Sequence, residues 1–137
     1  MAEFQTKQQK RAKFALENLP MENNKVNHKL SQFIIGMPNM ILSNGIGQTF
    51  AFVLSKQAKN GDEKKYGQTF DILKKWLEET MPGEFGGTKN NIEFLGKFNS
   101  INQAKYIQSQ EECLRLVEWL KRYARAFDEG DKKENKQ

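Results

Sequence analysis

The stretch ILSNGIGQTFAFVLSKQ, residues 41–57, places Asn44, Gly45 and Gly47 in the middle of a pattern that otherwise predicts one long apolar helix. Each glycine costs roughly 0.5 to 1 kcal/mol relative to alanine in a helix interior. Asn44 and Gly45 both tolerate the left-handed conformation that ends one helical segment and begins another, so the pair predicts a kink. We expect the backbone of another helix to approach the glycines closely and so compensate their cost. We therefore assign an architectural role to Asn44, Gly45 and Gly47.

Helical patterns extend over most of the chain. Valine occurs only at positions 26, 53 and 117, and no segment alternates polar and apolar residues for the length of a strand. Pro20, Pro38 and Pro82 lie where a helical pattern stops or restarts. These features predict an all-α fold, a compact single-domain bundle of about five to six helices over residues 1–127, followed by a disordered polar tail at 128–137. The expected helices cover residues 3–19, 25–36, 38–59, 62–81, 89–97 and 100–127.

The chain has 137 residues and a formal net charge of +5. This balance favours an anionic partner, of which nucleic acid is the commonest, although a modest surplus of surface lysines would explain it equally well. The longest apolar run, residues 50–54, is far shorter than the ~20 residues of a membrane-spanning helix. Cys113 is the only cysteine, so we expect no disulfide and a reducing compartment. Because no apolar block follows the first basic residues, we expect a cytoplasmic protein.

The last expected helix has two different sides. Its apolar side predicts a core face made of Cys113, Leu116, Val117, Leu120, Ala124 and Phe127. The opposite side is a mostly basic ridge that includes Lys121, Arg122 and Arg125. The ridge is either a contact for an anion or a solvated face whose cations are favoured by the helix dipole. The preceding SINQ predicts the start of this helix, because Ser100 and Gln103 have the spacing of a capping box.

The first expected helix also has a basic side. Lys7, Lys10 and Lys13 lie at helical spacing around Phe14, away from a narrow apolar stripe. In one interpretation Phe14 stacks on an unpaired base while the lysines hold neighbouring phosphates. In the other, which is commoner for such an aromatic residue, Phe14 covers a neighbouring helix or a partner subunit.

Residues suited to catalysis or metal binding are scarce. His28 and Cys113 are each the only residue of their type, so the minimum set of zinc ligands is missing. His28 and Ser31 have helical spacing, but the sequence offers no third group to orient a histidine base. The segments GIGQTF and GEFGGTK lack the order and the preceding strand of phosphate-binding loops, and the second reads better as a turn in which Thr88 caps the next helix. We expect no enzymatic activity, no cofactor and no metal.

The segment NGIGQTFAFVLSK, residues 44–56, resembles a motif of one known family. In the small all-helical subunit of the type III-B CRISPR effector, the Cmr complex, Asn-Gly-Leu is followed by Leu-Ala-Phe. QKRAKFALENL (9–19) resembles the first helix of that subunit, and LRLVEWLKRYARAF (114–127) resembles its final amphipathic helix. The chain departs from the motif at Ile46, where leucine is usual, and at Thr49-Phe50, where a smaller aliphatic side chain is usual.

The resemblance implies a non-catalytic subunit. Copies of it stack end to end as a short filament beside the backbone and large subunits, and a basic face borders the groove in which guide RNA pairs with target RNA. RNA cleavage belongs to the backbone subunit. We expect phosphate contacts without base specificity from cations that converge into one continuous strip, namely Lys7, Lys10, Arg11, Lys13, Lys56, Lys121, Arg122 and Arg125. The alternatives are a stand-alone helical nucleic-acid-binding module and a purely architectural adaptor.

Overall fold

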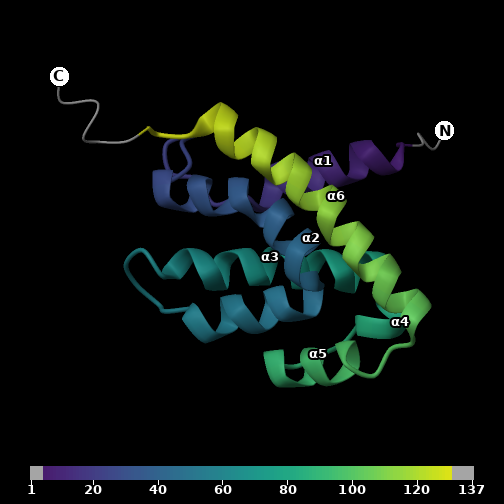
Figure 1. The fold of residues 1–137 in the computed structure, drawn as a ribbon. Helices are drawn as coiled ribbons and strands as arrows, with labels where there is room; N and C mark the ends of the chain where they lie inside the picture. The colour runs from purple at the N-terminus through teal and green to yellow at the C-terminus, as the bar shows by residue number, and fades with distance from the viewer. Residues whose placement is uncertain (1–4, 131–137) are drawn as a thin grey trace.

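The computed structural model describes residues 5–130, and within this range it contains helices and no strands, as the sequence predicts. The helices are α1 (Lys7–Asn18), α2 (His28–Lys56), α3 (Lys64–Thr80), α4 (Pro82–Phe85), α5 (Asn91–Phe98) and α6 (Gln103–Phe127). Figure 1 shows α6 crossing the molecule diagonally, where it contacts α1, α2 and α3. The bundle is therefore organised around its last helix.

The kink predicted in the opening stretch lies at Gly45, whose φ of 83° and ψ of 158° interrupt α2. Asn44 keeps a negative φ, so glycine alone makes the break. The expected boundary between residues 36 and 38 is wrong, because α2 continues through Pro38. Proline removes one backbone hydrogen bond, but Met37 and Ile41 on either side of it are fully buried, and their packing keeps the helix continuous.

Side chains of α6 cap the helical segment that restarts after Gly45. The backbone N–H of Ile46 donates to Gln110 Oε1 at 2.9 Å, and that of Gly47 donates to the Tyr106 hydroxyl at 3.1 Å. A Cβ atom on Gly45 would lie 3.1 Å from that hydroxyl. The close approach expected at the glycines therefore exists, but it is made by side chains of α6 and not by another backbone. Without these side chains, both N–H groups would lack hydrogen-bond acceptors.

Apolar side chains from every helix meet in one core. Phe50 lies at the centre of an aromatic cluster, with its ring centroid 5.3 Å from Phe70, 5.8 Å from Phe94 and 5.2 Å from Phe98. On α6 the predicted core face is confirmed, since all its members are buried except Phe127, which is half-buried. Burial raises the pKa of the Cys113 thiol, which is consistent with a small core residue.

The helices begin later than the sequence predicts, with α2 and α3 starting at residues 28 and 64 in place of 25 and 62, and the N-caps of α1, α5 and α6 show why. Thr6 caps α1 in a capping box with Gln9, so that helix begins at residue 7; residues 3 and 4, where we expected it to begin, lie outside the described range. Asn90 caps α5, whereas Thr88 donates its hydroxyl to Glu78. The expected capping box SINQ is also wrong, because Asn102 caps α6 and the Ser100 hydroxyl donates to the Gly96 carbonyl. In the last two cases an asparagine two residues further along competes successfully for the N-cap position.

The first residues of the expected tail are bonded to the loop before α2. The N–H of Val26 donates to the Phe127 carbonyl at 2.7 Å, and the N–H of Glu129 donates to the Val26 carbonyl at 2.9 Å. The carboxylate of Asp128 lies 3.1 Å from His28 Nδ1. The bundle thus includes residues 128–130, and the rest of the expected tail, 131–137, lies outside the described residues.

The Gly45→Val substitution should destabilise the fold. Valine must adopt a backbone conformation that is essentially restricted to glycine, and its Cβ meets the Tyr106 hydroxyl, so we expect a loss of about 1 to 3 kcal/mol or more. Urea unfolding measures it. The control is Gly36→Ala, at an exposed helical position with open space around a Cβ, where a gain of roughly 0.5 to 1 kcal/mol is expected. A Gly45→Val midpoint equal to that of the wild type would contradict the role of the kink.

The Tyr106→Phe substitution tests the cap directly. It removes only the hydroxyl that accepts from Gly47, and an unpaired N–H in this half-buried position should cost about 1 to 3 kcal/mol of unfolding free energy. The control is Tyr123→Phe, since Tyr123 is also half-buried on α6 but makes no hydrogen bond through its hydroxyl to any residue of the described range. Equal midpoints for the two variants would show that the cap does not contribute.

Candidate nucleic-acid interface

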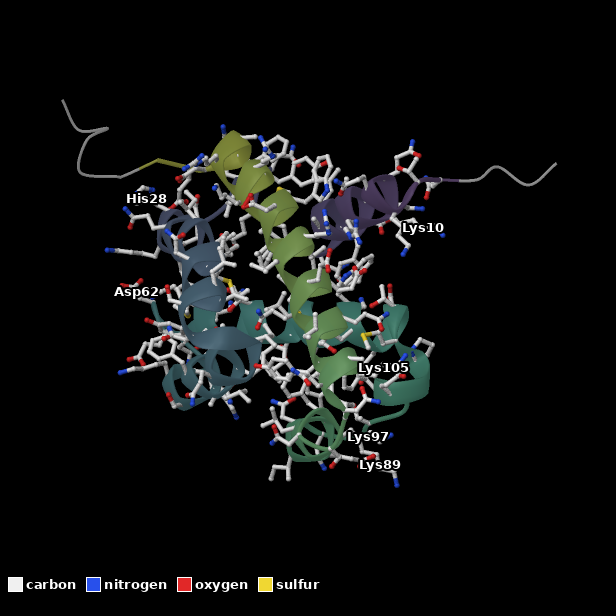
Figure 2. All side chains as sticks on the ribbon, turned by 45° about the vertical axis from the view of Figure 1, so that its right-hand side comes forward. Lys10, His28, Asp62, Lys89, Lys97 and Lys105 are labelled. Carbon is white, nitrogen blue, oxygen red and sulfur yellow. The ribbon has the colours of Figure 1, made fainter. Side chains whose placement is uncertain are left out.

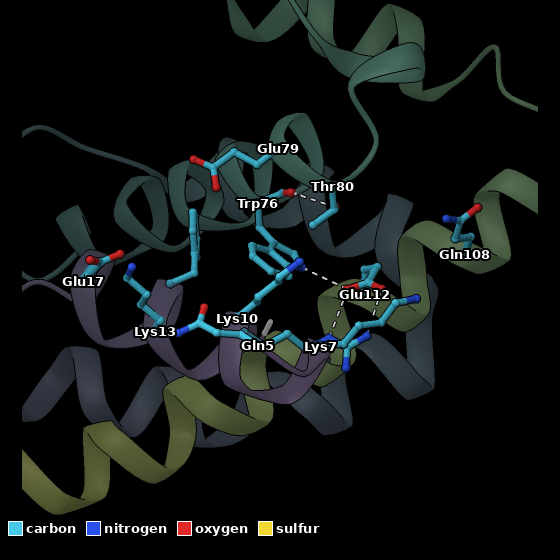
Figure 3. A pocket seen from close by; sticks show the side chains of 12 residues that line it. Gln5, Lys7, Lys10, Lys13, Glu17, Trp76, Glu79, Thr80, Gln108 and Glu112 are labelled. Atoms are coloured by element: carbon cyan, nitrogen blue, oxygen red, sulfur yellow. Dashed lines mark hydrogen bonds and ion pairs between the residues drawn. The ribbon is translucent and has the colours of Figure 1, made fainter. Parts of the chain in front are cut away.

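An open cleft of about 500 Å³ lies between α1, α3 and α6. Figure 3 shows Lys7, Lys10 and Lys13 on the α1 side of the cleft and Glu79 and Thr80 on the α3 side. All three lysines are exposed, and none forms an ion pair with any residue between 5 and 130. The structure therefore brings three of the predicted contact residues together.

Phe14 forms the floor of this cleft and is only 5% exposed. Its ring centroid lies 4.9 Å from that of Trp76 on α3, at an interplanar angle of 54°. A ring covered in this way has no free face on which a base could stack. Of the two interpretations of Phe14, the one in which it covers a neighbouring helix is confirmed.

Arg11 is the exception among the cations of α1, because it is only 7% exposed and its guanidinium is bound within the protein. Its Nε and Nη2 donate to the two carboxylate oxygens of Glu112 at 3.2 and 3.0 Å. Trp76 Nε1 donates to the same carboxylate at 3.2 Å, so three helices meet at Glu112. Arg11 therefore fixes α1 on the bundle, and its expected role as a phosphate contact is corrected.

The ionisation of Glu112 reflects these partners. Burial raises the pKa of the carboxyl, but the hydrogen bond and charge of Arg11, the Trp76 hydrogen bond and the charge of Lys7 together outweigh burial, so the pKa is lowered from its ordinary value of 4.5. Sequence reasoning did not single out Glu112. No local signal identifies its partner, because Arg11 lies 101 positions earlier in the chain.

The predicted cations outside α1 do not continue the lysine cluster. Arg122 lines a separate hollow with Gln8, Arg115, Glu118 and Trp119, which shares no residue with the α1 cleft. Lys121 Nζ lies 3.8 Å from Glu118 Oε1 on the same helix, and Arg125 is exposed on the last turn of α6.

Lys56 ends α2, and that end of the helix lies on the left in Figure 1 while α1 begins on the right. The expected single continuous strip is therefore wrong. The cations form a cluster of three lysines on α1, a set of arginines and one lysine on α6, and the distant Lys56.

The arrangement around His28 gives it a structural role. His28 faces Asp128, and the Ser31 hydroxyl donates to the Ala124 carbonyl at 3.2 Å and not to the imidazole ring. Between residues 5 and 130, no three His, Cys, Asp or Glu side chains form a group that could hold a metal ion. Every buried polar side-chain atom in that range also has a hydrogen-bond partner within the protein.

Fold and surface together define a small all-α protein with a lysine-lined cleft. None of the helices in the described range is long and apolar enough to cross a membrane. A family model described as CRISPR-associated protein (Cas_Cmr5) matches residues 7–127. The chain belongs to this family, and it is a small subunit of the type III-B Cmr complex of CRISPR defence, as the resemblance implied. It accordingly associates with other subunits of that complex.

The Glu112→Gln substitution should cost about 1 to 3 kcal/mol at pH 7, because it leaves the buried Arg11 without a charged partner. A carboxyl whose pKa is lowered by folding contributes stability above the unfolded value of 4.5, and this stability is lost as the pH falls through the lower folded value. The difference in unfolding free energy between the variant and the wild type should therefore decrease under acidic conditions. Urea unfolding from pH 7 to pH 3 measures it.

The control for this series is Glu111→Gln. Glu111 is 57% exposed and pairs with Arg115 at the surface, where such a pair contributes at most about 0.5 kcal/mol. A gap for Glu112→Gln that stays constant with pH, or that matches the control at pH 7, would show that the Arg11 pair does not hold α1.

Proposed function

We propose that this chain is a non-catalytic subunit that lines the groove holding paired guide and target RNA in the cytoplasmic Cmr ribonucleoprotein. Copies of the chain stack end to end beside the backbone and large subunits, so that their α1 helices follow the RNA. The observation that carries the proposal is the cluster of exposed Lys7, Lys10 and Lys13 beside the open cleft.

The geometry of α1 suits contacts with a phosphate backbone. Lysines three residues apart are separated by about 4.5 Å along a helix axis, so the cluster presents three ammonium groups over about 9 Å. Lysine binds phosphate as a flexible point charge and reads no base sequence, which a subunit serving many different guides requires. The buried Arg11 pair supports this role because it fixes the helix that carries the lysines.

The cations of α6 provide a second, weaker set of contacts. Arg122 and Arg125 are exposed and form no ion pair with any described residue, so both guanidiniums are available to an anion. Lys121 is partly engaged by Glu118, and Lys56 lies at the far end of α2. We rank these two below the α1 lysines as RNA contacts.

The test replaces Lys7, Lys10 and Lys13 together by glutamine in the reconstituted complex. Removing three phosphate contacts should weaken retention of target RNA and lower the slope of log K against log salt concentration by about 2 to 3, at roughly 0.7 to 0.9 per contact. The control removes the same charge at exposed lysines away from α1, by Lys29→Gln, Lys59→Gln and Lys89→Gln. Figure 2 shows Lys89 at the end of the molecule opposite Lys10.

The outcomes separate the three candidate functions. If both triple variants give the wild-type salt slope, the chain is an architectural adaptor and the RNA contact is refuted. If the isolated wild-type chain binds RNA as tightly as the assembled complex does, the chain is a stand-alone binding module, because a filament subunit gains its affinity from assembly.

A further inference from the structure

A second open hollow, of about 540 Å³, lies between the first turn of α1 and the middle of α6. It is lined by Gln8, Arg115, Glu118, Trp119 and Arg122. Trp119 is the only one of these with an aromatic or apolar side chain, so the hollow combines one ring with polar and charged walls. A ligand for this hollow must satisfy both features.

Trp119 is held in place by residues of both helices. Its Nε1 donates to Gln8 Oε1 at 3.0 Å, so the polar edge of the indole is satisfied within the protein. Its ring centroid lies 5.9 Å from that of Tyr123, one turn further along α6. Among residues 5–130, no lysine or arginine lies over the indole face, although arginines line the same hollow. A half-exposed aromatic surface in a fixed orientation is therefore left for a ligand.

The charges around this ring leave one arginine unpaired. Arg115 Nη2 donates to Glu111 Oε1 at 2.8 Å, and Lys121 Nζ lies 3.8 Å from Glu118 Oε1. Arg122 is exposed and forms no ion pair with any described residue. The hollow therefore offers a free guanidinium to an anion beside an aromatic ring.

These features separate the candidate ligands. An apolar side chain of a protein partner would cover the indole but would desolvate the four polar side chains around it without giving them hydrogen bonds. An acidic peptide would pair with Arg122 but leave the aromatic surface in water. An unpaired nucleotide satisfies both, because its base stacks on an aromatic ring and its phosphate pairs with a guanidinium. A base within a duplex has no free face to offer.

The position of the hollow favours a nucleotide that belongs to an RNA strand. Gln8 lines the hollow, and Lys7, the residue before it, lines the α1 cleft. Because consecutive Cα atoms lie about 3.8 Å apart, the two sites flank the same helical turn. A single strand that passes over the start of α1 can therefore place a phosphate beside Lys7 and a base on Trp119.

We propose that this hollow is a stacking site for one unpaired nucleotide of an RNA strand, with the base on Trp119 and the phosphate beside Arg122. The inference rests on the proposed contact of this chain with RNA, but it does not depend on the α1 lysines. Stacking releases no counterions, so loss of the ring should weaken binding without changing the salt slope.

The test follows the two tryptophans of the full chain, labelled with fluorotryptophan, by fluorine NMR. A short oligouridylate should move the Trp119 signal, because a stacked base changes the surroundings of the ring. The signal of Trp76, which is only 6% exposed, should stay in place. Parallel titrations use an RNA duplex, uridine monophosphate and polyglutamate.

Substitutions measure each contribution through the Kd for a fluorescein-labelled oligouridylate, with circular dichroism as the check on folding. Trp119→Leu should raise the Kd at least about fivefold, whereas Trp119→Phe, which keeps a ring, should raise it less than about threefold. Arg122→Gln should raise it at least about fivefold, because a charge-assisted hydrogen bond to phosphate is lost. The control Lys89→Gln removes the same charge at an exposed position and should change the Kd less than about twofold.

Other results overturn the proposal. A Trp119 signal that oligouridylate does not move excludes stacking, and equal movement with the duplex assigns the hollow to paired RNA. Equal movement with polyglutamate assigns it to an acidic protein segment. Uridine monophosphate that binds as tightly as the oligomer assigns it to a free nucleotide. Equal losses for Arg122→Gln and Lys89→Gln would show that only the overall charge matters.

The same measurements separate this site from the α1 contact. If the triple glutamine variant of the α1 lysines keeps the wild-type salt slope while oligouridylate still moves the Trp119 signal, only the α1 contact fails. If that variant lowers the slope but the Trp119 signal never moves, only the stacking site fails.

Discussion

The backbone N–H groups released at Gly45 must find acceptors, and the architecture depends on where they find them. Gln110 and Tyr106 supply these acceptors from a helix about sixty positions further along the chain. An unpaired N–H in a half-buried site costs about as much as a core methyl group contributes, so the two helices have one favourable register. The glycine break and the α6 cap are thus a single structural unit.

The cap positions α1 and its lysine cluster through a short series of contacts. Tyr106 and Gln110 fix the first half of α6, and Glu112, half a turn later, receives both Arg11 and Trp76. That carboxylate determines how α1 lies on the bundle. The cations of α1 therefore differ in burial. The Arg11 guanidinium is bound inside the protein by a bidentate carboxylate, whereas the lysine ammonium groups remain in water.

Periodic patterns predicted the helical class, the core face of α6 and the kink, because each depends on residues close together in sequence. Gly45 was recognisable since only glycine accepts its conformation at low cost. Arg11, by contrast, has the same local surroundings as its lysine neighbours and differs only through Glu112, 101 positions away. The helix boundary predicted at Pro38 was wrong because the buried side chains that keep α2 continuous there pack against segments distant in the sequence. The prediction of a single cationic strip was wrong for the same reason, since a helical wheel does not show how the helices of the bundle are arranged.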